Sequence, residues 1–199
     1  MSILISGALG AFPAGWKALF DGKTLNGWKA NENPETFKVM DGMIVAEGKK
    51  SHLFYTGSVQ NAEFKNFELK ADFKTEPEAN SGIYFHAAFN YSNFPQKGYE
   101  VQIANGSGVG PTTGSLYNVV DFSDSPVHHG EWFTIHIIVK DTKVITKVND
   151  KLRLEYDEKT DPNAVGRKSP KISSGTFAIQ NWNPKSRFYV KNIFVKPLP

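Results

Sequence analysis

The residues best placed to do chemistry lie in the stretch GYEVQI, residues 98–103. Glu100 and Gln102 are two positions apart, so in a β-strand their side chains project from the same face. A carboxylate on a rigid strand can act as a general base or accept hydrogen bonds from sugar hydroxyls. The opposite face is apolar and is expected to pack in the core; it carries Tyr99, Val101 and Ile103. The alternative is that Glu100 belongs to an ordinary solvated sheet face.

Two further predicted strands carry polar or aromatic side chains opposite an apolar face. These side chains are Tyr84 and His86 on one strand and Gln180 and Trp182 on the other. If all of these strands line one concave face, their side chains converge into a set that binds sugars through hydrogen bonds and ring contacts. Tyr117 follows a glycine-rich segment and either donates a hydrogen bond or a proton into such a site, or simply packs its loop.

The remaining histidines give no metal signature. His52 and His136 have no partner nearby in the sequence and are expected to be structural. His128 and His129 are adjacent, and neighbouring side chains on an extended backbone diverge, so they are expected to be exposed. The chain has no cysteine, which excludes disulfides and thiolate metal sites. No cofactor and no metal ligand is predicted, although a divalent cation such as calcium is left open because oxygen ligands are available.

Composition indicates one globular domain. The chain has 199 residues, and its 15 Phe supply material for a core. The net charge is +3 with scattered lysines, which argues against a nucleic-acid partner. No apolar run is long enough for a transmembrane helix. Residues 1–15 are interpreted as an N-terminal extension, either the remnant of an export signal or a segment introduced by cloning. Residues 16–199 are interpreted as the domain. The oligomeric state is left open.

Alternation of apolar and polar residues with a period of two predicts strands along most of the chain. The runs lie at 67–74, 83–88, 98–103, 132–139, 144–154, 177–182 and 188–195. Turn residues separate them, such as Asn149-Asp150, and helical periodicity is nearly absent. The pattern predicts an all-β fold, an antiparallel two-sheet sandwich. Two longer loops, 104–114 and 157–170, interrupt the rhythm; the first follows GYEVQI and is the better candidate for the rim of a site.

An ordered set of motifs resembles a known family, the 3-keto-disaccharide hydrolases, a bacterial family long described as a domain of unknown function. The resemblance runs from about Trp16 to Leu198. The motifs are LFDGKTLNGW at 19–28, Asp41-Gly42, NSGI at 80–83, GYEVQI at 98–103, GSLY at 114–117, GEW at 130–132 and FYVKNIFVKPL at 188–198. It implies a jelly-roll sandwich of the concanavalin A-like lectin/glucanase type and an exported bacterial protein, periplasmic or extracellular.

The resemblance also implies action on sugars whose C3 hydroxyl has been oxidised to a ketone. Such a ketone acidifies the C2 proton, so that a base can remove it, the C1 substituent leaves and water adds back. Glu100 or His86 is the expected base, with Tyr117 and Gln102 as hydrogen-bond donors. Gln180, Trp182, Tyr84 and Asn80 complete the expected sugar-binding set.

Two departures from the family pattern favour an alternative. The family usually has Arg where His86 stands, and a His-Gly pair where Asn181-Trp182-Asn183 follows Gln180. A lectin-like carbohydrate-binding domain without catalysis would fit these changes, and a structural or partner-binding domain is a third interpretation. The linkage and the exact sugar are not specified by the sequence.

Overall fold

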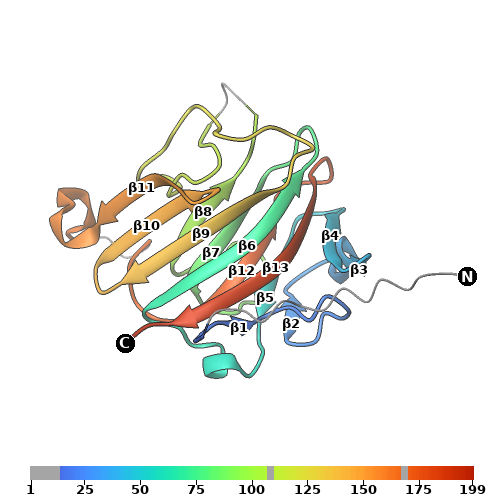
Figure 1. The fold of residues 1–199 in the computed structure, drawn as a ribbon, viewed down its shortest axis with the longest axis horizontal. Helices are drawn as coiled ribbons and strands as arrows, with labels where there is room; N and C mark the ends of the chain where they lie inside the picture. Colours follow the sequence, from blue (N-terminus) through green and yellow to red (C-terminus); the bar gives the residue numbers. More distant parts are fainter. Residues whose placement is uncertain (1–13, 107–109, 167–169) are drawn as a thin grey trace, which may run out of the picture.

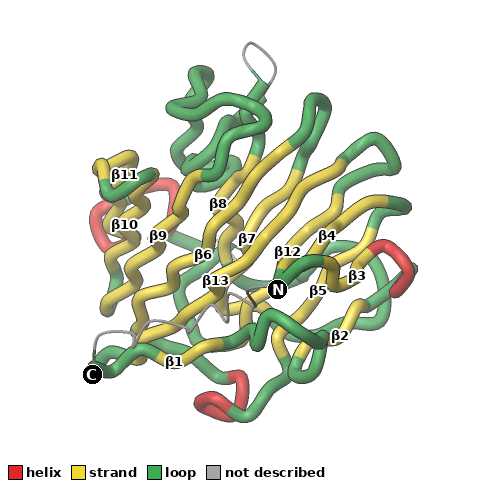
Figure 2. Tube along the Cα trace, turned by 45° about the vertical axis from the view of Figure 1, so that its right-hand side comes forward, coloured by secondary structure: helices red, strands yellow, loops and turns green. Residues whose placement is uncertain are grey.

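Two antiparallel sheets packed face to face form the molecule, seen in the computed structural model (Figure 1). The structure describes residues 14–106, 110–166 and 170–199. The predicted N-terminal extension falls almost wholly outside these residues. The all-β, two-sheet prediction is confirmed, and 3-10 helix is confined to short turns between strands (Figure 2): Pro34–Thr36, Val59–Ala62, Glu158–Thr160 and Pro162–Ala164.

The larger sheet has the strand order β11-β10-β9-β6-β13-β4-β3, and β1 pairs with the second half of β13. Its strands are β1 (Lys17–Ala18), β3 (Phe37–Met40), β4 (Met43–Glu47), β6 (Phe67–Thr75), β9 (Phe133–Lys140), β10 (Lys143–Val148), β11 (Lys151–Asp157) and β13 (Arg187–Pro197). Its central strand β6 alternates strictly between buried and half-buried residues, as a sheet with one face on the core requires.

The smaller sheet has the order β2-β5-β12-β7-β8. Its strands are β2 (Trp28–Ala30), β5 (Ser51–Tyr55), β7 (Ser81–Ala87), β8 (Tyr99–Ile103) and β12 (Thr176–Asn181). In Figure 1 this sheet lies behind the larger one. GYEVQI therefore forms an edge strand, next to the strand that begins with the NSGI motif.

Local sequence explains the hairpins that connect these strands. Asn149 and Asp150 join β10 to β11 with φ angles of 50° and 61°, and Asn and Asp tolerate this left-handed conformation better than most residues. Asp41 and Gly42 do the same between β3 and β4, with φ angles of 49° and 78°. Both turns were predicted from the sequence.

An aromatic core joins the two sheets. Phe177 of the smaller sheet lies 4.6 Å from Phe64 and 4.9 Å from Phe67 between ring centroids. Phe67 of the larger sheet also contacts Phe85, at 5.8 Å and nearly edge to face. Such pairs add to the stabilisation that burial of the rings already gives. The smaller sheet is thereby held rigidly, and it is this sheet that carries the predicted site.

The outer face of the smaller sheet is covered, which alternation alone does not predict. Every residue of β5, β7, β8 and β12 is buried. Main-chain bonds attach the segment 113–117 to β8, with Gly114 N donating to Gln102 O and Tyr117 N donating to Glu100 O, each at 3.0 Å. The polar side chains of this face are therefore shielded from solvent, and the segment 113–117 extends the sheet beyond the edge of β8.

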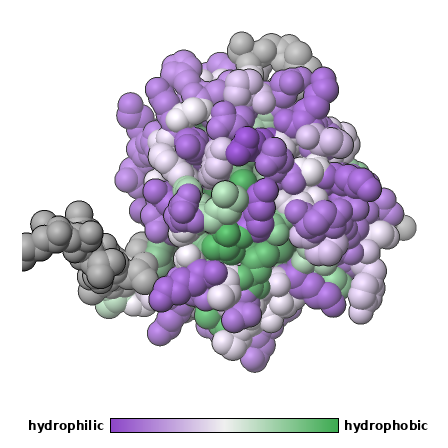
Figure 3. Space-filling view, turned by 90° about the vertical axis from the view of Figure 1, so that its right-hand side faces the viewer, coloured by the Kyte–Doolittle hydropathy of each residue, from purple (hydrophilic) through white to green (hydrophobic). Residues whose placement is uncertain are grey.

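Two further features of the molecule are the length of its helices and the polarity of one of its sides. Within the described residues, no helix is long and apolar enough to cross a membrane. The side of the molecule that carries β2, β3 and β4 shows apolar side chains at its centre, surrounded by hydrophilic ones (Figure 3).

Candidate functional site

A cavity of about 480 Å³ lies over the outer face of β7, β8 and β12. This volume is in the range of pockets that bind small molecules. The lining residues are Asn80, Tyr84, Phe94, Pro95, Gly98, Glu100, Gln102, Tyr117, Asn118, Pro170, Gln180 and Trp182. Of the predicted site residues, the structure thus brings all but His86 to one cavity.

Glu100 lies on the floor of this cavity and is only 7% exposed. Its Oε1 atom is buried and has no hydrogen-bond partner. Burial raises the pKa of the Glu100 carboxyl to about 7, and hydrogen bonding from the Tyr84 hydroxyl lowers it only in part. A carboxyl group that lines a cavity and has a pKa near neutral is suited to take a proton from a bound molecule.

Tyr84 connects Glu100 to Gln180. Tyr84 and Glu100 are paired across β7 and β8, and Gln180 Nε2 donates to the Tyr84 hydroxyl at 3.2 Å. Burial, together with the charge of Glu100, raises the pKa of Tyr84 above its usual value. Tyr84 therefore keeps its proton at neutral pH and holds the carboxylate in place.

A second pair of polar side chains extends the floor. Gln102 Nε2 donates to Asn80 Oδ1 at 2.9 Å, and the Asn80 main chain is held by Ser186 Oγ and Trp182 N. An amide nitrogen has two hydrogens, so Gln102 retains one donor for a ligand. The pair offers hydrogen bonds to sugar hydroxyls or to a carbonyl oxygen.

Aromatic side chains form the walls. Trp182 is 41% exposed and lies 5.3 Å from Phe94 between ring centroids, with their planes tilted by 34°. Tyr117 is exposed to the same extent and faces the cavity from the segment attached to β8. Trp182 therefore lies at the cavity as the sequence predicted, where a sugar ring can stack on its face.

Trp182 gives the first testable prediction. Replacing it with Ala is expected to weaken binding of a 3-keto-glucoside about tenfold, roughly 1–2 kcal/mol, because a ring-face contact is lost. Isothermal titration calorimetry measures the change. Trp132 is a matched control, since it is 37% exposed but lies beside Lys191 of the larger sheet. Equal losses for the two variants would contradict the assignment of Trp182 to the binding wall.

Gly82 leaves the space that Glu100 occupies. It lies on β7 opposite Gln102, and a Cβ atom added there would lie 2.7 Å from Glu100 Cγ and overlap its carboxylate. Contacts this short do not occur between carbon atoms without movement. The glycine of the NSGI motif is therefore explained by the carboxylate beside it.

Replacing Gly82 with Ala is expected to displace the Glu100 carboxylate and lower activity at least tenfold. It is also expected to cost about 1–3 kcal/mol of stability, as overpacking usually does. Steady-state kinetics and thermal unfolding measure both effects. Gly106→Ala is the control, since nothing lies within 4 Å of a Cβ atom at Gly106. Unchanged activity in Gly82→Ala would show that the position of Glu100 is not critical.

The prediction that His86 shares the site with Tyr84 is wrong. An extra residue in β7 shifts its register against β12 between Tyr84 and Ala87, and His86 adopts a φ of 56° within this bulge. The bulge turns the ring away from the cavity. His86 Nε2 donates to Lys65 O at 2.8 Å, and Nδ1 accepts from Ser173 N at 3.1 Å. Both ring nitrogens are occupied, so His86 is a structural residue.

Several lining residues were missed by the sequence interpretation. Phe94, Pro95, Asn118 and Pro170 come from irregular segments, and Pro170 belongs to the loop for which no role was expected. For Asn118, the only signal in the sequence was that it directly follows Tyr117, a predicted site residue. In the described part of the chain, no cluster of three or more His, Asp or Glu side chains is arranged to hold a metal ion.

The fold defines a class, the antiparallel two-sheet jelly-roll sandwiches. Residues 15–196 match the family described as the 3-keto-alpha-glucoside-1,2-lyase-like domain. This chain belongs to that family. The match extends over nearly the whole chain and confirms the resemblance stated from the sequence motifs.

Individual relatives agree with this assignment. A 3-keto-disaccharide hydrolase of Bacteroides thetaiotaomicron is 27% identical over 170 residues, covering 71% of this chain and 58% of the relative. The chain thus spans little more than half of that protein. A proposed glycosyl hydrolase of Parabacteroides distasonis is 26% identical with a TM-score of 0.73, covering 92% of this chain and 99% of the other. The comparisons identify the chain as a relative of carbohydrate-cleaving enzymes.

A more distant likeness bears on the fold alone. The carbohydrate-binding module CBM66 from Bacillus subtilis is 11% identical with a TM-score of 0.58 and covers 85% of this chain and 95% of the module. The jelly-roll prediction is thereby confirmed.

Proposed function

We propose that this protein cleaves glycosides whose sugar carries a ketone at C3, by elimination across C1 and C2 followed by hydration. One observation carries the proposal: among the described residues that line the cavity, Glu100 is the only carboxylate. Ordinary glycosidases need two carboxyl groups, one on each side of the bond that breaks. Elimination from a 3-keto sugar needs only one base, because the ketone already acidifies the C2 proton.

The Glu100 carboxylate takes the C2 proton, and the C2–H electron pair forms an enolate with the C3 carbonyl. The enolate reforms the ketone as the C1–O bond breaks, giving a C1–C2 double bond and releasing the alcohol after it gains a proton. Water then adds at C1 and C2 regains a proton, so that the net reaction is hydrolysis. Stopping before the addition of water would make the protein a lyase.

The neighbouring groups are assigned roles that follow from their positions. Gln102 donates its free amide hydrogen to the developing enolate oxygen. Tyr117 supplies the proton to the leaving oxygen, while Gln180 and Asn80 hold ring hydroxyls and Trp182 stacks on the ring. Tyr84 orients Glu100 through the hydrogen bonds described above. The route as written uses no cofactor, and activity measured after dialysis against EDTA tests this part of the proposal.

A carbohydrate-binding role without turnover is the second candidate. The half-exposed Trp182 beside Phe94 favours it, since such an aromatic pair is sufficient to hold a sugar ring. Export from a bacterial cell, implied by the family resemblance, is proposed with either function.

The test is incubation with a 3-keto-glucoside and with 3-keto-trehalose, following sugar release by chromatography. Substrate deuterated at C2 adds a mechanistic readout. Elimination predicts loss of deuterium to solvent or a primary isotope effect at that position. Turnover with full retention of deuterium and no isotope effect would exclude the elimination route, and binding without turnover would favour the second candidate.

A further inference from the structure

His52 lies one strand beyond the cavity and is fully buried with no partner for either ring nitrogen. It pairs with Gln180 across β5 and β12, so its side chain is on the same sheet face as the cavity floor. Its exposed fraction is 0%, and neither Nδ1 nor Nε2 has a hydrogen-bond partner. Leaving buried polar atoms unpaired is costly and calls for an explanation.

Aromatic rings separate His52 from the cavity. The His52 ring lies 5.6 Å from Tyr84 and 5.4 Å from Phe94 between centroids, both nearly edge to face. Phe94 in turn packs against Trp182. Tyr84, Phe94 and Trp182 all line the cavity. Of the two rings that lie between His52 and the cavity, Tyr84 is fixed on strand β7, whereas Phe94 comes from an irregular segment.

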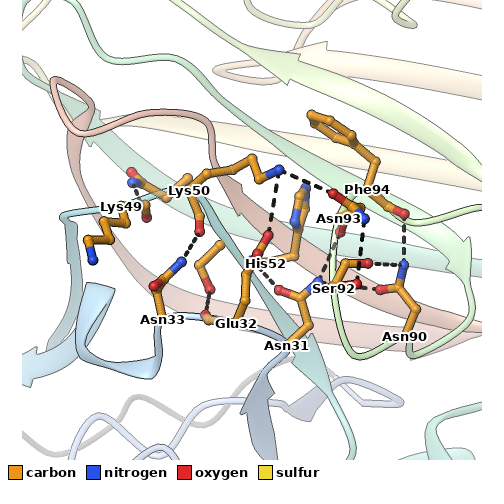
Figure 4. Close-up of polar contacts among 12 residues, drawn as sticks. Asn31, Glu32, Asn33, Lys49, Lys50, His52, Asn90, Ser92, Asn93 and Phe94 are labelled. Atoms are coloured by element: carbon orange, nitrogen blue, oxygen red, sulfur yellow. Dashed lines mark hydrogen bonds and ion pairs between the residues drawn. The ribbon is translucent and has the colours of Figure 1, made fainter.

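Polar side chains surround this position (Figure 4). Asn31 Nδ2 donates to Asn93 O at 2.9 Å, and Lys50 Nζ lies 3.5 Å from Asn93 Oδ1 and 3.8 Å from Glu32 Oε1. These bonds attach the segment that carries Phe94 to β5 and to the end of β2. Lys50 Nζ carries three hydrogens, so it retains a donor for a hydroxylated molecule beside His52.

We propose that the outer face of the smaller sheet holds a second sugar-binding subsite, with His52 as its floor and Phe94 as its cover in the free protein. The occupant is the leaving sugar of a disaccharide whose oxidised ring lies over Glu100, so this assignment rests on the proposed function. From β8 to β5 there are three strand spacings, roughly 14 Å, a span suited to two linked sugar rings.

The chemistry of His52 selects an uncharged occupant. Burial, with a smaller contribution from Lys50, lowers the pKa of His52 to about 4. The ring is then neutral at physiological pH, with one nitrogen donating and one accepting. This combination matches a hydroxyl group, which does both, and offers no charge to a phosphate or carboxylate.

The test compares a two-ring with a one-ring substrate. His52→Phe keeps the ring among its aromatic neighbours and removes the nitrogens. It is expected to raise KM for 3-keto-trehalose at least tenfold and to change kcat/KM for methyl 3-keto-glucoside less than twofold. Phe89→Ala is the control, because Phe89 packs on Phe54 near the same segment and does not line the cavity. Equal effects on both substrates, or none on either, would overturn the subsite.

A second variant tests the cover. Phe94→Ala is expected to make His52 reactive toward diethyl pyrocarbonate, located by mass spectrometry, whereas His52 of the wild type stays unmodified. Trehalose should protect His52 in this variant, and glucose at the same concentration should not. An unreactive His52, or equal protection by both sugars, would refute the proposal. These readouts need no turnover, so they separate failure of the subsite from failure of the proposed function.

Discussion

Replacing Glu100 with Gln is expected to lower kcat for a 3-keto-glycoside by about 10²–10⁴-fold, the usual cost of losing a general base. The amide keeps the size and much of the hydrogen-bonding capacity of the carboxylate, but it cannot take the C2 proton. Binding should change far less, because Tyr84 and the walls of the cavity stay in place. The expected pattern is therefore a loss in kcat with a nearly constant dissociation constant.

Single-turnover kinetics and calorimetric titration on the same preparation separate these two effects. Glu155→Gln, on an exposed position of β11, controls for the loss of one negative charge. If Glu100 only accepts a hydrogen bond from a sugar hydroxyl, the substitution should instead weaken binding, by roughly 1–3 kcal/mol, and leave kcat nearly unchanged. That result would remove Glu100 as the base.

The pH dependence of the wild-type protein gives the second large effect. The base must be deprotonated, and burial raises the pKa of Glu100 to about 7. The value of kcat/KM is therefore expected to rise with pH and to reach half its maximum near pH 7. A flat profile between pH 5 and pH 8 would contradict the assignment.

Stability should move in the opposite direction over the same range. The folded-state pKa of Glu100 lies above the unfolded value of 4.5, so between these values the folded protein retains a proton that the unfolded chain has lost. Stability attributable to this group is present below about pH 4.5 and decreases as the pH rises through 7, by at most about 3 kcal/mol. Urea denaturation at pH 5 and pH 8 measures the slope, which Glu100→Gln should reduce. If the free energy of unfolding changes with pH equally in wild type and variant, folding does not raise the pKa of Glu100.

The strands from β6 onward were predictable because they obey local rules, whereas β1 to β5 were not among the predicted runs. In β6 the alternation of side chains matches burial residue by residue, and at Asn149-Asp150 the turn chemistry fixes the hairpin. The position of Glu100 and Gln102 on one face, opposite a buried Val101, follows from the same rule. Those parts of the site that lie on regular strands were therefore accessible from sequence.

The rest of the site depends on contacts that alternation does not encode. The bulge in β7 changes the face of His86, and no residue pattern in the sequence marks the extra position. Phe94 and Pro170 reach the cavity through irregular segments whose paths are set by packing. His52 was expected to be structural, and its position beside the cavity arises from the pairing of β5 with β12, which are more than a hundred residues apart in sequence.

The segment 113–117 has a consequence for solubility. Strand β8 ends the smaller sheet, and an uncovered terminal strand presents free amide and carbonyl groups that can pair with another molecule and start aggregation. The bonds from Gly114 and Tyr117 occupy that edge. The same few residues thus bring Tyr117 to the cavity and protect the sheet from intermolecular pairing. Residues 113–117 thus have two structural roles, one at the wall of the cavity and one at the edge of the sheet.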